Sequence, residues 1–116
     1  MQTIPQIILA QLGNNVFIEK VGATHIAATS DKRGIEAGEE KGGNTLLVNT
    51  RENSKKIHCV SITLLPSDTY LMEFIRMDYI TSDIQIINSI KSVYCDQLTE
   101  IFAEYTGIDL PEVLFF

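Results

Sequence analysis

The sequence has no tryptophan, only two cysteines and no long apolar run. Two cysteines exclude a disulfide framework, so Cys59 and Cys95 are predicted to be free thiols, as in a cytoplasmic protein. A membrane-spanning helix needs about 20 apolar residues, and no segment approaches that. The N-terminal apolar stretch follows no basic region and is interrupted by Gln6 and Gln11, unlike a signal peptide. We therefore expect a cytoplasmic protein without membrane contact.

Basic residues are also few: nine lysines and arginines against 15 acidic residues give a net charge of −6 and a pI near 4.7. Nucleic-acid binding is driven by basic side chains that neutralise phosphates, so nucleic acid is not expected as the main ligand. A basic groove for single-stranded DNA remains the second hypothesis. It would have to be assembled from Lys20, Arg51, Lys55, Lys56, Arg76 and Lys91.

What is present is the composition of a globular domain, with 45% hydrophobic and 21% charged residues in 116 positions. This length favours a single domain over residues 1–116. Residues 31–44 hold four of the seven glycines and one large apolar residue, which predicts a flexible loop. Residues 109–116 form an apolar tail.

Helical periodicity marks both ends of the chain. Thr3 is a predicted cap with Pro5 in the first turn, and Gly13 ends this first helix. A second helix is predicted from about Val93 to Gly107. Its apolar stripe consists of Leu98, Ile101, Phe102 and Tyr105.

Between the helices, β-favouring segments alternate with turns. Strands are predicted within 15–23, continuing or pairing with 25–29, then over 45–51, 57–65, 69–77 and 84–90. No helix-length pattern lies between residues 45 and 90, which argues against a βαβ fold. The fold class predicted is α+β, a two-layer sandwich in which an antiparallel meander of four to five strands packs against an N-terminal and a C-terminal helix.

No convergent catalytic set appears, so no catalytic, cofactor-binding or metal-binding residue is predicted, and no cofactor. His58 and Cys59 are neighbours on a strand and point to opposite faces, so they cannot share a metal ion. Cys95 lies near a helix start, where the helix dipole can lower a thiol pKa. A stripe of Asp96, Glu100 and Glu104 fits a solvated helix face or a cation site. A small thiol- or metal-dependent enzyme is the third hypothesis.

Apolar side chains supply the candidate interaction surface. Leu114, Phe115 and Phe116 end the sequence without a polar residue among them, and Tyr70 and Phe74 lie on a strand that mixes aromatic and charged residues. These five residues either fill the protein's own core or cover a neighbour. We expect a homo-oligomer, with another protein as the alternative partner.

Three segments resemble small uncharacterised proteins encoded by phages, prophages and related mobile elements. They are AQLGNNVFIEKVGATH at 10–25, VSITLLPSDTYLMEFIRM at 60–77 and VYCDQLTEIFAEYTGI at 93–108. The resemblance implies a small accessory protein and supplies no catalytic residue. The leading hypothesis is therefore a non-enzymatic accessory or interaction protein of a phage or mobile element.

Overall fold

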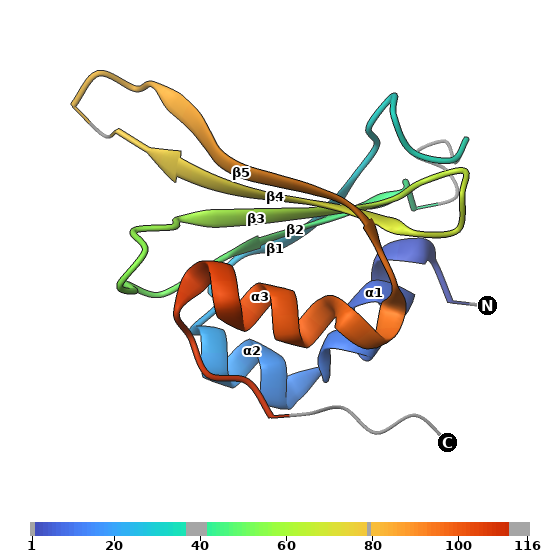
Figure 1. Ribbon diagram of the computed structural model, residues 1–116, viewed down its shortest axis with the longest axis horizontal. Coiled ribbons are helices and arrows are strands. Elements are labelled where there is room, and N and C mark those ends of the chain that lie inside the picture. The colour runs from blue at the N-terminus through green and yellow to red at the C-terminus, as the bar shows by residue number, and fades with distance from the viewer. Residues whose placement is uncertain (1, 37–41, 79, 112–116) are drawn as a thin grey trace.

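A computed structural model describes residues 2–36, 42–78 and 80–111. Five antiparallel strands form one sheet in the order β1-β2-β3-β4-β5, so each strand pairs with its neighbours in sequence. The helices all lie against the same face of this sheet (Figure 1). The predicted α+β fold, with an antiparallel meander and a helix near each end, is confirmed.

The first helix, α1, spans Ile4–Leu12 and begins as predicted. Thr3 and Gln6 form a capping box, in which the backbone N–H of Thr3 donates to Gln6 Oε1 (2.8 Å) and that of Gln6 donates to Thr3 Oγ1 (3.3 Å). Gly13 ends the helix with φ 119°, in the region that favours glycine.

The strand predicted within residues 15–23 is wrong, because Asn15–Val21 form a second helix, α2. Phe17 and Val21 lie four residues apart and are both fully buried, which places them on one helical face. Phe17 packs edge-to-face on Phe102 of the last helix, with ring centroids 5.0 Å apart. This tertiary contact outweighs the β preference of the valine and isoleucine residues in the segment.

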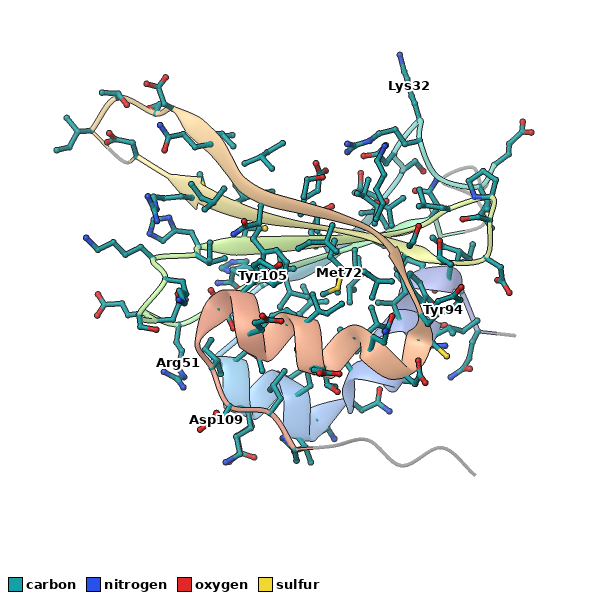
Figure 2. The ribbon with its side chains drawn as sticks, in the orientation of Figure 1. Lys32, Arg51, Met72, Tyr94, Tyr105 and Asp109 are labelled. Atoms are coloured by element: carbon teal, nitrogen blue, oxygen red, sulfur yellow. The ribbon has the colours of Figure 1, made fainter. Side chains whose placement is uncertain are left out.

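The five strands are β1 (Ile26–Thr29), β2 (Thr45–Asn49), β3 (Cys59–Leu64), β4 (Tyr70–Met77) and β5 (Ile84–Val93). Alternate residues face the helices. In β3, Val60 and Ile62 lie in the core, as the period-two pattern predicts. In β4, Met72 and Phe74 do the same, and Figure 2 shows Met72 between the two layers.

The last helix starts later than predicted. Strand β5 continues to Val93, which is buried and pairs with Tyr70, and a short 3-10 turn, η2 (Cys95–Gln97), precedes α3 (Leu98–Thr106). Leu98 and Phe102 are buried as expected, and Ile101 and Tyr105 pack at the edge of the core. Gly107 ends α3 with φ 75°.

Candidate functional site

The face of the sheet turned away from the helices is partly covered by the segment that follows β1. This segment and the start of β2 are tied together through Asn44, whose Nδ2 donates to the backbone carbonyls of Asp31 (2.9 Å) and Ile35 (2.8 Å). The backbone N–H of Ile35 in turn donates to the carbonyl of Leu64 (2.8 Å). Both described ends of the predicted 31–44 loop are thus bonded to the sheet or to each other, while residues 37–41 lie outside the described residues.

An ion pair joins this segment to the middle of the sheet. Arg33 donates through Nη1 to Glu73 Oε2 (3.2 Å) and through Nη2 to Glu73 Oε1 (2.5 Å). The Glu73 side chain is only 8% exposed. Arg33 also donates to Asp31, and this hydrogen bond holds the pKa of the Asp31 carboxyl below its ordinary value of 3.8. One feature of the sequence indicates this cluster: Glu73 is a single acidic residue among the apolar residues of a predicted strand.

Beyond the covered part, the same face carries exposed apolar side chains. Ile75 pairs with Ile86, and Met77 pairs with Ile84, so these four residues lie on the face opposite Phe74 and the core. Ile86 is 57% exposed and Ile84 is 65% exposed. We call Ile75, Met77, Ile84 and Ile86 the isoleucine patch. It lies on the β4–β5 hairpin, which projects beyond the helical layer (Figure 1).

The isoleucine patch adjoins a sheet edge that is unpaired within residues 2–36, 42–78 and 80–111, where β5 has a partner strand on one side only. This edge strand is ten residues long and contains neither proline nor any charged residue between Ile84 and Ile90. Natural edges are usually short or charged, since an unpaired strand offers backbone hydrogen-bonding groups to another chain. The opposite edge, β1, has four residues. The long apolar β5 edge is therefore the better template for pairing.

The predicted interaction residues do not form this surface. Tyr70 is 5% exposed and Phe74 is fully buried, and both belong to the core on the helix side of the sheet. Of the two alternatives predicted for these residues, both rings therefore fill the protein's own core and neither covers a neighbour. Tyr70 instead donates a hydrogen bond to Gln11 of α1 (2.7 Å). Leu114, Phe115 and Phe116 lie outside the described residues.

Cys95 and His58 lie at opposite ends of strand β4. Both cysteines are free, as predicted, with Cys59 partly buried and Cys95 exposed. Desolvation raises the pKa of the Cys59 thiol, which disfavours its nucleophilic form. Cys95 follows the end of β5 that pairs with Tyr70, the first residue of β4. His58 lies at the other end of β4, where its Nδ1 accepts a hydrogen bond from the backbone N–H of Met77 (2.7 Å). The length of β4 separates them by roughly 20 Å, so Cys95 and His58 cannot act as a catalytic pair.

The six basic residues of the predicted groove fall into separate groups. Arg51 Nε donates to the carbonyl of Lys20 at the end of α2 (3.1 Å). Lys55, Lys56 and Arg76 line a common hollow, while Lys91 lies near the far end of β5. A continuous groove built from all six, as the second hypothesis required, is therefore not formed.

The acidic stripe remains on the surface. Asp96 in η2 and Glu100 and Glu104 on α3 are exposed. Among the residues that the structure describes, no three His, Cys, Asp or Glu side chains are grouped closely enough to hold a metal ion. In the same part of the chain, no helix combines the length and apolar character needed to cross a bilayer.

The chain matches no protein-family model, no curated protein and no solved structure.

Proposed function

We propose that the protein is a non-enzymatic interaction protein that works as a homodimer, joined through the β5 edge and the isoleucine patch. The observation that carries this proposal is the coincidence of the two features on one hairpin. The exposed Ile84 and Ile86 belong to the ten-residue strand β5, whose outer edge is unpaired within the described residues. Pairing would satisfy the edge and bury the isoleucines together.

Charge supports a second copy as the partner. The protein carries a net charge of −6, yet β5 is uncharged from Ile84 to Ile90 and is flanked by Asp83 on one side and Lys91 on the other. In an antiparallel pairing of two copies, the Asp83 end of one strand lies beside the Lys91 end of its partner. The two-fold arrangement therefore brings together opposite charges at the ends and apolar residues in the middle.

The biological setting follows from the resemblance of three segments to proteins of phages and mobile elements. It supports an accessory role in the cytoplasm of a host cell, performed through assembly. The buried Tyr70 and Phe74 contribute to this role indirectly, because they fix β4, on which the hairpin is built.

Sedimentation equilibrium of the wild type and of Ile86→Lys tests the proposal. The wild type is expected to have twice the mass of one chain, and Ile86→Lys to be a monomer, because pairing would bring one buried lysine from each copy close to the two-fold axis. Ala27→Lys is the matched control, since Ala27 is an exposed residue of the other edge strand, β1. Circular dichroism should show that both variants remain folded.

A monomeric wild type at all protein concentrations would contradict the proposal. So would loss of the dimer in Ala27→Lys with its retention in Ile86→Lys, because that result would place the interface at β1.

A further inference from the structure

A hollow of about 620 Å³ opens on the helix side of the sheet, between the β2–β3 loop, the β4–β5 hairpin and the C-terminal half of α3. Its charged side chains are Lys55, Lys56, Arg76 and a single acid, Glu104. The hollow is therefore locally positive in a protein whose net charge is −6. We call it the basic pocket; it does not include the isoleucine patch.

Arg76 connects β4 to the loop that carries the two lysines of the pocket. Its guanidinium donates from Nη2 to the carbonyl of Lys55 (3.0 Å) and from Nε to the carbonyl of Lys56 (3.2 Å). These acceptors are neutral, so they hold the arginine in place without cancelling its charge. Both salt bridges within the described residues belong to Arg33, on the other face of the sheet. Three cationic side chains thus line the pocket without a salt bridge to a carboxylate, although Lys56 and Arg76 also line the adjoining hollow, which contains Glu52, Asp78 and Asp83. An anion would stabilise the cationic side chains of the basic pocket.

Lys56 adopts a conformation that a lysine rarely takes. Its φ is +56°, in the left-handed region where glycine is favoured and the backbone of other residues is strained. The loop is held in this shape by Asn53, whose Oδ1 accepts from the N–H of Ile57 (3.0 Å) and whose Nδ2 donates to the carbonyl of Ile57 (2.8 Å). A lysine at a position that suits glycine is consistent with a use for its charge.

The uncharged lining of the pocket combines polar and flat apolar groups. Ser54 and Asn88 supply polar side chains, while Ile57, Ile87 and Tyr105 supply apolar surface. The Tyr105 ring is stacked on Phe74, with centroids 5.2 Å apart and an interplanar angle of 29°, so its orientation is fixed by the core. Figure 2 shows Tyr105 between α3 and the sheet. An aromatic ring at such a site can stack a planar group.

We propose that the basic pocket binds a nucleotide, with its phosphate against Lys55, Lys56 and Arg76 and its base against the apolar lining. The volume fits a small ligand, for which pockets of about 300–1,000 Å³ are usual. A free nucleotide and one unit of a single strand share this chemistry. Glu100, an exposed acid on α3 outside the pocket lining, would repel a neighbouring phosphate of a strand, which favours the free nucleotide.

Isothermal titration calorimetry with adenosine monophosphate tests this assignment. The nucleotide should bind, adenosine should not, and added salt should weaken binding, because the phosphate supplies the charge. Lys56→Gly should weaken binding about 10-fold or more, the loss expected for one charge-assisted hydrogen bond. The same variant should unfold at an unchanged or higher temperature, because glycine relieves the left-handed strain. If Lys56 had only a structural role, the substitution would not weaken nucleotide binding while leaving the unfolding temperature unchanged or higher.

Lys32→Ala is the matched control: it removes the same charge from a side chain that projects from the opposite side of the sheet (Figure 2). It should bind the nucleotide as the wild type does. Absence of binding to the wild type, or equal affinities of Lys56→Gly and Lys32→Ala, would overturn the basic pocket as the site. Tighter binding of a short oligothymidylate than of the mononucleotide would overturn the free nucleotide as its ligand.

Discussion

Arg33 and Glu73, which are 40 residues apart in sequence, form a two-pronged ion pair on the helix-free face of the sheet. The carboxylate is nearly buried, whereas the Arg33 side chain is 49% exposed. Ser89 of β5 contributes a longer hydrogen bond from its hydroxyl to Glu73 (3.4 Å). The ion pair therefore connects the segment after β1 to the centre of the sheet and accounts for the acid inside β4.

Arg33→Ala should lower the free energy of unfolding by about 1–3 kcal/mol, because it leaves the Glu73 carboxylate buried without its cationic partner. Urea unfolding would measure this loss. Lys32→Ala, one residue away and exposed, is the control and should cost less than about 0.5 kcal/mol. If the two variants lost equal stability, Arg33 would have no special role. Partial recovery in Arg33→Ala combined with Glu73→Gln would identify the unpaired charge as the cause.

Stability should also fall with acid through Asp31. Its pKa is lowered in the folded state by the hydrogen bond from Arg33, so its contribution is fully present above the unfolded pKa near 3.8 and is lost as the pH falls through the folded pKa. Urea unfolding from about pH 5 downward should show this loss. Asp78, whose pKa is lowered by the backbone N–H of Ile80, adds a background slope. Arg33→Ala should retain that background and lose the Asp31 part, and an unchanged slope would contradict the assignment.

Phe102→Ala should cost about 3–5 kcal/mol, the usual range for truncating a buried phenylalanine. The side chain is fully buried and packs edge-to-face against Phe17 at 5.0 Å and Phe74 at 6.3 Å. It therefore joins α2, α3 and the sheet. Glu100→Ala on the exposed side of α3 is the control and should change little. Thermal or urea unfolding that showed equally small effects would mean that α3 is not docked as described.

The two thiols should react at different rates with a disulfide reagent such as dithionitrobenzoate at neutral pH. Cys95 is exposed and should react first, whereas Cys59 is partly buried and its raised pKa leaves less thiolate. Substituting Cys95 by serine should remove the fast phase and leave the slow one. A fast phase that persisted in this variant would show that Cys59 is accessible.

The sequence predicted an element correctly where the periodicity of its apolar residues agreed with the face that is buried in the structure. The alternation of β3, the Thr3 cap and the stripe containing Phe102 were all predicted correctly. It failed at Asn15–Val21, where seven residues are too few for helical periodicity to outweigh β-favouring residue types. It also failed at Val93, which suits a strand or a helix equally well and is fixed in β5 by its pairing with Tyr70.

The surfaces were harder to predict than the elements. For Tyr70 and Phe74 the sequence left core and interaction surface as alternatives, because a strand pattern does not say which face the helices cover. The pairing of Ile75 with Ile86 and the meeting of Lys55, Lys56 and Arg76 depend on register and loop shape. Both are set by contacts between residues distant in sequence, so neither is visible as a motif.

The two edge strands of the sheet differ in length, and this difference would determine whether assembly ends at a dimer or continues into a filament. If β5 of one molecule paired with β1 of the next, each addition would expose another β5, and the sheet would grow into an open filament. Strand β1 offers only four residues to the ten of β5, so such a head-to-tail junction would leave most of β5 unpaired. Joining β5 to its own copy instead can pair a longer part of this edge, limited by the register shifts of β5 opposite Tyr70–Met72 and Phe74–Ile75, and leaves only the short β1 edges outside. Lengthening β1 would thus be expected to convert a closed assembly into a polymerising one.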